Sequence, residues 1–171
     1  MSAVLERPVA VLERPVALPS REALHDFYDA YFEALDDLRL EEWPDFFVED
    51  CLFQVIPREN YDAGYQLCTI QADSKGMLAD RVQGILKTQM FAPRTCRRFY
   101  SGLRATGREK GLVKVRQNVI VIQTLIDGPS LVHICGVGHD LLEETGEGFR
   151  FRERILVIDS EMIPNSLIYP A

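Results

Sequence analysis

The sequence predicts a single α+β domain in which N-terminal helices pack against a curved antiparallel sheet. Helical spacing of apolar residues ends before Pro93, and the chain beyond Pro93 shows the alternation and turn signals of consecutive strands. The longest predicted strand, 112–126, contains neither Gly nor Pro. It would extend for about 50 Å if it were straight, which is too long for a domain of 171 residues. We therefore expect it to bend, and a bent sheet has a concave face that other elements must fill.

Composition limits the kinds of partner and compartment. The formal charge of -7 argues against nucleic acid or an anionic membrane as the principal partner. No stretch is long and apolar enough to span a bilayer, and the N-terminus lacks the layout of a signal peptide. The four cysteines are widely spaced and form no CxxC pair, which is typical of buried free thiols. We expect a cytoplasmic protein.

Charge is unevenly distributed along the chain. Residues 22–50 are strongly acidic and residues 94–116 are strongly basic. The arginines Arg97, Arg98 and Arg104 carry planar, permanently charged groups that suit subunit interfaces. The two segments can meet within the fold or between subunits, or they can form two separate solvated faces.

The N-terminal residues 1–19 are predicted to form an extended arm. Residues 3–16 contain the sequence AVLERPV twice. A period of seven suggests a coiled coil, but Pro8 and Pro15 would interrupt each helical turn. Residues 20–171 are predicted to form the single folded domain.

Three helices are predicted within this domain. Ser20 is a suitable N-cap for the first helix. Apolar residues recur at helical spacing after it, at Leu24, Phe27, Tyr28, Tyr31, Phe32, Leu35 and Leu38. A shorter second helix is predicted over 39–48, where Pro44 is tolerable in the first turn. Asp73 or Ser74 would cap the third helix.

Strand patterns occupy most of the remaining sequence. They cover residues 51–56, 65–71, 95–104, 112–126, 131–142 and 149–158. A polar loop spans 57–64. Val119 to Ile122 is apolar at every position, which is typical of a strand covered on both faces. The closing segment, 163–171, is apolar, and we expect it to dock on a surface or on a neighbouring subunit.

The pattern of histidines and cysteines does not indicate a metal site. His133 and His139 fall on the same face of one predicted strand, but about 20 Å apart, whereas ligands must converge on one ion. The third histidine, His25, lies far away in the sequence. The paired Cys–His motifs of a Rieske cluster, a glycine-rich phosphate loop and a nucleophile elbow are all absent.

Acid–base catalysis inside the concave face is an alternative. The candidates are His133, His139, Asp140 and Glu153. Glu153 is the most suggestive of them, because the alternation places it on the face of Phe149, Phe151, Ile155 and Val157, opposite Arg150, Arg152 and Arg154. A carboxylate in apolar surroundings has a raised pKa unless it is paired. A pairing Arg or Tyr would instead make its role structural.

Several stretches resemble the small (β) subunit of aromatic-ring-hydroxylating dioxygenases, the Rieske-type oxygenases. They are LRLEEWPDFFVEDC at 38–51, REN at 58–60, DSKGMLADRV at 73–82 and RILVIDS at 154–160, followed by the Ile-Pro and Tyr-Pro pairs at 163–164 and 169–170. The resemblance covers about residues 20–171, in order. The WPxFF and DSxGML motifs are most similar to the branch that acts on aromatic acids such as salicylate or terephthalate.

The resemblance implies a cone-shaped α+β fold like those of scytalone dehydratase and ketosteroid isomerase. It implies a non-catalytic subunit with no cofactor of its own. Such a subunit assembles with a large (α) subunit, usually as an α3β3 hetero-hexamer. The large subunit carries the Rieske 2Fe–2S cluster and the mononuclear iron, and a reductase or ferredoxin reaches the complex through it. Together they hydroxylate an aromatic compound in catabolism.

The expected function is therefore to hold three large subunits in register, so that electrons pass from one subunit's cluster to the next subunit's iron. Six residues are predicted to lie at the subunit interface, because they sit in or beside the loop and helix start where the motifs concentrate. They are Arg58, Asn60, Tyr61, Asp73, Ser74 and Arg81.

Two other functions remain open. A free-standing isomerase, dehydratase or cyclase of the same cone fold would need a closed apolar pocket with His133 and Glu153 pointing inward. A small-ligand binding protein would have an open pocket without such a pair.

Overall fold

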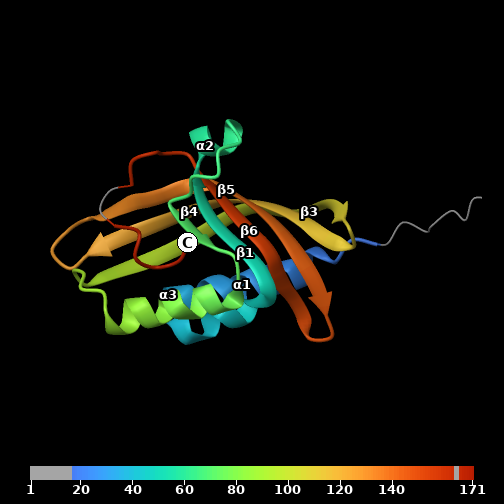
Figure 1. Ribbon diagram of the computed structural model, residues 1–171, viewed down its shortest axis with the longest axis horizontal. Coiled ribbons are helices and arrows are strands. Elements are labelled where there is room, and N and C mark those ends of the chain that lie inside the picture. The colour runs from blue at the N-terminus through green and yellow to red at the C-terminus, as the bar shows by residue number, and fades with distance from the viewer. Residues whose placement is uncertain (1–16, 164–165) are drawn as a thin grey trace, which may run out of the picture.

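The computed structural model describes residues 17–163 and 166–171. The repeat at 3–16, and with it most of the predicted arm, lies outside the described residues. The described chain forms a six-stranded curved sheet with two longer helices on its concave side (Figure 1). This is the α+β architecture that the sequence predicts.

The helices begin where the capping residues predict. Helix α1 spans Arg21–Asp36, and the Ser20 hydroxyl accepts a hydrogen bond of 3.1 Å from the backbone N–H of Ala23. Helix α3 spans Lys75–Lys87, and Ser74, one of the two predicted caps, accepts from the N–H of Met77. The segment predicted as a second helix is a 3-10 helix instead, η1, Leu40–Phe46. Pro44 lies inside it and removes a backbone donor, which disfavours a regular α-helix there.

The strands are β1 Phe47–Pro57, β2 Ile70–Ala72, β3 Arg94–Glu109, β4 Leu112–Leu125, β5 Ser130–Thr145 and β6 Gly148–Ile158. Their order across the sheet is β2-β1-β6-β5-β4-β3. All neighbours are antiparallel except β1 and β6, which run parallel. The loop predicted at 57–64 contains a short helix, α2, Arg58–Asp62, and the strand predicted at 65–71 shortens to β2.

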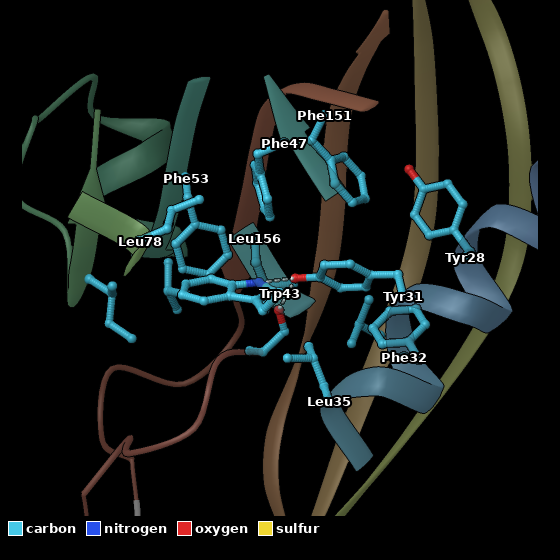
Figure 2. Packing of buried hydrophobic residues seen from close by; sticks show 14 of the residues in the cluster. Tyr28, Tyr31, Phe32, Leu35, Trp43, Phe47, Phe53, Leu78, Phe151 and Leu156 are labelled. Atoms are coloured by element: carbon cyan, nitrogen blue, oxygen red, sulfur yellow. Dashed lines mark hydrogen bonds between the residues drawn. The ribbon is translucent and has the colours of Figure 1, made fainter. Parts of the chain in front are cut away.

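A cluster of large side chains fills the concave side of the sheet (Figure 2). Trp43 is fully buried at its centre, and its indole N–H donates a hydrogen bond of 3.1 Å to the hydroxyl of Tyr31. The ring of Tyr31 packs edge-on against that of Phe151. The ring of Phe47 packs edge-on against that of Trp43. The interior of the cone is thus packed with aromatic rings.

The strand predicted to be covered on both faces is covered on one. Val119 and Val121 are buried against the core, but Ile120 is 40% exposed on the opposite, outer face. The expectation that 119–122 is enclosed on each side is therefore wrong for the chain by itself. An apolar stretch of sheet is left facing outwards.

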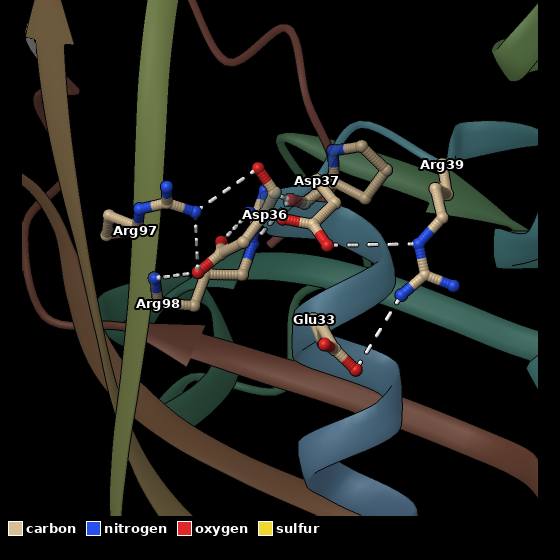
Figure 3. A network of polar contacts seen from close by, with 7 residues as sticks. Glu33, Asp36, Asp37, Arg39, Arg97 and Arg98 are labelled. Atoms are coloured by element: carbon tan, nitrogen blue, oxygen red, sulfur yellow. Dashed lines mark hydrogen bonds and ion pairs between the residues drawn. The ribbon is translucent and has the colours of Figure 1, made fainter.

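The acidic and basic segments meet within the fold. Asp36, at the end of α1, forms an ion pair with Arg98 on β3, whose guanidinium lies 2.6 Å from the Asp36 carboxylate (Figure 3). The guanidinium of Arg97 lies 4.0 Å from the same carboxylate. Arg39 faces Glu33 and Asp37 of the same region. Opposite charges in these two segments thus fix α1 against the edge of the sheet.

Candidate functional site

A buried ion pair occupies the concave face, where an enzyme with this architecture would hold its substrate. The guanidinium of Arg154 on β6 lies 2.8 Å from the carboxylate of Asp140 on β5. The same carboxylate oxygen accepts hydrogen bonds from the Tyr28 hydroxyl at 2.6 Å and from the Gln117 amide at 3.1 Å. Arg154 is fully buried and Asp140 is 3% exposed. Neither charged group is accessible to a dissolved substrate.

Aromatic rings enclose this pair. The Arg154 guanidinium lies 4.7 Å from the ring centre of Tyr31 and 5.0 Å from that of Phe151, within cation–π range. Burial alone would lower the pKa of Arg154, but the Asp140 carboxylate and the tyrosines outweigh it and raise that pKa. Burial raises the pKa of Asp140. The nearby Arg154 and Tyr28 lower that pKa in part but do not cancel the effect of burial. The arrangement stabilises a fixed charge pair and offers no group poised to move a proton to a ligand.

Glu153 does not point into the interior, so the structure does not favour the alternative of an acid–base site there. Phe151 pairs with Leu142 and Glu153 pairs with Leu141, which leaves Arg152 as an extra residue in β6. This bulge shifts the alternation by one position, because side chains on a strand alternate with a period of two. Arg154 therefore enters the core in place of Glu153, and the prediction that it shares an outer face with Arg150 and Arg152 is also wrong.

His133 and His139 do not share a face either. Ile122 pairs with Val132 and Val121 pairs with Ile134, so His133 sits in a second bulge and is buried. His139 lies on the outer face, where Tyr61 of α2 stacks on its ring at 5.7 Å between centres. Burial, with help from two nearby arginines, lowers the pKa of His139. His133 and Glu153 are thus not brought together.

Glu153 instead lines a hollow of about 260 Å³ on the outer face. Tyr61, His139, Lys114 and Arg116 also line this hollow. Lys114 is paired at 3.0 Å with Glu109 across the β3–β4 turn. The hollow is open and carries both signs of charge, which is typical of a contact surface.

Three of the predicted interface residues lie on α2, on the outer side of the sheet. Arg58 is exposed and forms an ion pair with Asp159, which lowers the pKa of that carboxyl group. Asn60 donates a hydrogen bond of 2.8 Å to the carbonyl of Leu67 and so closes the following loop. Tyr61 is 41% exposed above His139. These contacts hold α2 in place and leave its outer surface available.

The other three lie around α3, on the helix side. Ser74 caps the helix, and Asp73 precedes it in an exposed position. Arg81 donates hydrogen bonds of 3.1 Å to the carbonyls of Leu167 and Ile168. Ser74 and Arg81 thus have structural roles within the chain, whereas Asp73 stands at the surface. The structure does not bring the two groups of three together.

The C-terminal segment docks on the chain itself. Arg98 donates to the carbonyl of Pro170 through two guanidinium nitrogens, and Arg94 donates to that of Ser166 at 3.2 Å. Ala171 is 1% exposed within the core. Sequence reasoning expected this docking but missed the arginines that produce it, since regular alternation does not reveal which charged side chains turn inwards.

The cysteines and histidines do not assemble into a metal centre. Cys51, Cys68, Cys96 and Cys135 are all free thiols. Within 17–163 and 166–171, no three His, Cys, Asp or Glu side chains are placed to hold one metal ion. No helix in the same residues is long and apolar enough to cross a membrane.

Comparison with known proteins gives one consistent family. The family model described as ring hydroxylating beta subunit matches residues 31–165. The anthranilate 1,2-dioxygenase small subunit of Burkholderia cepacia is 31% identical over 140 residues, which cover 82% of this chain and 87% of that protein. Subunit beta 2 of the terminal oxygenase component of terephthalate 1,2-dioxygenase from Comamonas sp is 25% identical, over 84% of this chain and 94% of that protein.

Solved structures agree in fold. The β subunit of a protein assigned to the aromatic-ring-hydroxylating dioxygenases, from Novosphingobium aromaticivorans, superposes with a TM-score of 0.80 and is 37% identical, covering 88% of this chain and 96% of that one. A protein from the same organism assigned as a scytalone dehydratase superposes with a TM-score of 0.65 at 18% identity, covering 86% of this chain and 89% of that one. The second likeness shows the predicted cone fold alone.

Proposed function

This chain belongs to the family of ring-hydroxylating β subunits, and on that premise we propose that it is a non-catalytic structural subunit of an aromatic-ring-hydroxylating dioxygenase. The observation that carries the proposal is the sealed interior. The Asp140–Arg154 pair and its aromatic neighbours occupy the concave face, where a cone-fold enzyme would need accessible acid–base groups. The chain's surfaces are then what it contributes to the complex.

The partner is a large oxygenase subunit. In this proposal the Rieske cluster and the mononuclear iron belong to the large subunit, which also receives electrons from a reductase or ferredoxin. The small subunit holds neighbouring large subunits at a fixed spacing within a hetero-hexamer. A rigid, mostly β platform suits that task, because electron transfer between subunits requires a constant geometry.

The substrate class proposed for the complex is an aromatic carboxylic acid. The support is the pair of related small subunits, whose names specify anthranilate and terephthalate. A cytoplasmic location is also proposed, and the four free thiols favour a reducing compartment.

The six residues Arg58, Asn60, Tyr61, Asp73, Ser74 and Arg81 remain the proposed contacts with the large subunit. Arg58, Tyr61 and Asp73 fit this role best, because all three are exposed. Arg81 and Ser74 would act indirectly, by fixing the C-terminal segment and the start of α3.

Native mass measurement of the complex, with an iron assay on each separated chain, tests the proposal. We expect this chain to co-purify with a large subunit and the iron to remain with that subunit after separation. His133→Ala and Glu153→Gln should leave turnover by the assembled oxygenase close to wild type, since neither residue faces a substrate. A stable monomer that assembles with no large subunit, or iron bound stoichiometrically to this chain, would overturn the proposal.

A further inference from the structure

The outer face of the sheet is covered by the chain at one end and bare at the other. Helix α2 contacts β1 and β6, and the outward-facing Ile56 and Val157 are only 4% and 1% exposed. Among the residues that the structure describes, such cover is lacking on β3 and at the start of β5. There Phe99 is 55% exposed and Val132 is 57% exposed.

The bare region forms one continuous apolar strip. Phe99 pairs with Ile120, and Ile122 pairs with Val132, so these four side chains are neighbours on adjacent strands. We call Phe99, Ile120, Ile122 and Val132 the outer strip. Contiguous exposed apolar surface of this kind marks a contact site, because exposure to water is unfavourable for each member.

The hairpin that joins β4 to β5 exposes further apolar side chains. Ile126 at its tip is 74% exposed, and Leu131 is 57% exposed. Leu131 pairs with the buried Gln123, so it lies on the face opposite to the outer strip. The strip therefore ends at Ile122 and Val132.

Positive charge borders the outer strip. From Arg97 to Arg104 on β3, and at the positions paired with them on β4 and β5, no carboxylate is present. Arg104 lies directly opposite Arg116, and like charges in this arrangement are unfavourable unless the opposite charge is supplied. Further along the face, Glu109 and Glu153 line the hollow beside Arg116.

A second copy of this chain does not fit these requirements. Packing the outer strip against itself would bring together the arginines that border it, at strand positions that hold no carboxylate. The acidic side of α1, with Glu22, Asp26, Asp29 and Glu33, would supply the opposite charge. However, no large apolar side chain of α1 is exposed beside those residues, so it could not cover the outer strip.

We propose that the outer strip is the docking surface for the large oxygenase subunit, which meets it with an apolar centre bordered by carboxylates. This inference rests on the function proposed above. It assigns the contact to the outer face of β3, β4 and β5, in addition to the six residues on and around α2 and α3 that the sequence motifs indicate.

The double variant Ile120→Thr, Val132→Thr tests the apolar part of the surface. Both residues are exposed, and Thr keeps the β-branched shape that suits a strand, so the isolated chain should keep its circular dichroism spectrum. We expect affinity for the co-purified large subunit to fall about tenfold or more. The matched control is Leu86→Gln, which removes a 50% exposed apolar side chain from α3 and should leave affinity unchanged. Equal affinities for the double variant and wild type would overturn the inference.

Arg116→Glu tests the charged border. Because complementary charge mainly accelerates encounter, the association rate should fall about tenfold at low salt and the difference should shrink at high salt. An unchanged association rate would overturn the assignment of carboxylates to the partner's surface.

Thiol labelling supplies a measurement on the unaltered chain. Cys135 pairs with Ile120 and is exposed on the same face, whereas Cys51 and Cys96 are buried. Labelling of Cys135 by a maleimide should be at least about tenfold slower in the complex than in the isolated chain.

Equal labelling rates of Cys135 in the complex and in the isolated chain would overturn the inference while leaving the small-subunit function intact. If no large subunit co-purifies at all, the proposed function itself fails. Protection of Cys135 in a complex of this chain with itself would identify a second copy as the occupant and also overturn the inference.

Discussion

Arg154 and Asp140 show how one residue's surroundings decide whether a charged side chain is structural or reactive. Both are buried, their charged groups lie 2.8 Å apart, and Tyr28 and Gln117 also donate hydrogen bonds to the carboxylate oxygen that faces Arg154. Removing one member of a buried pair leaves the other charge without compensation, at a cost of about 3–5 kcal/mol. An exposed pair typically contributes less than about 1 kcal/mol.

Arg154→Met should therefore lower the free energy of unfolding by about 3–5 kcal/mol. Adding Asp140→Asn to it should recover part of that loss, since the second change removes the stranded buried charge while keeping the side-chain shape. The measurement is urea unfolding of the three chains. Arg152→Met is the matched control, because Arg152 pairs with Glu143 in a partly exposed position, and its cost should stay below about 1 kcal/mol.

The interpretation fails if Arg154→Met costs no more than Arg152→Met. It also fails if Asp140→Asn makes the Arg154→Met chain less stable still.

At the scale of elements, the sequence predicts the strands well and their faces incompletely. The predicted strands 112–126 and 149–158 match β4 and β6 within one residue, since an uninterrupted β-branched run admits little else. The bulge at Arg152 leaves no compositional sign, because it adds one residue without needing Gly or Pro. It exchanges Glu153 for Arg154 in the core, and so the candidate acid–base site was assigned to the wrong face.

The C-terminal segment depends on Arg98 more than on its neighbour Arg97. The Arg98 side chain is 1% exposed and contacts both Asp36 and the Pro170 carbonyl, whereas the Arg97 side chain is 57% exposed. We expect Arg98→Met to lower the free energy of unfolding by about 3 kcal/mol and Arg97→Met to lower it by less than about 1 kcal/mol. Chemical denaturation of both variants provides the comparison. Similar costs for the two would mean that the arginine does not anchor the segment.

At the scale of the whole molecule, the cone architecture and the family follow from the sequence, but the assembly surface does not. A strand that is apolar on both faces is predicted to be buried on both. The pattern does not indicate whether the second face is buried by the same chain or by a partner chain. Ile120 is exposed in this chain although its sequence context is that of a buried strand. The six predicted contacts remain a prediction, since a partner's surface is not encoded in this sequence.

Unfolding of the whole domain should be a single cooperative transition. The parallel pairing of β1 with β6 ties the first strand to the last, and Trp43, the only tryptophan, is fully buried between them and the helices. Trp43 fluorescence and far-ultraviolet circular dichroism should therefore report the same urea midpoint within error. Two distinct midpoints would show that the sheet and the helical side unfold separately.

That parallel pairing also has a consequence for how the protein is made. A ribosome releases β1 early, yet the strand that flanks it on one side, β6, is among the last to emerge. Until then β1 is bordered only by the three-residue β2, and its other edge has free backbone donors and acceptors. Each nascent chain thus passes through a period of synthesis in which it is vulnerable to aggregation, so translation speed and chaperone supply should affect yield more than the stability of the finished domain does.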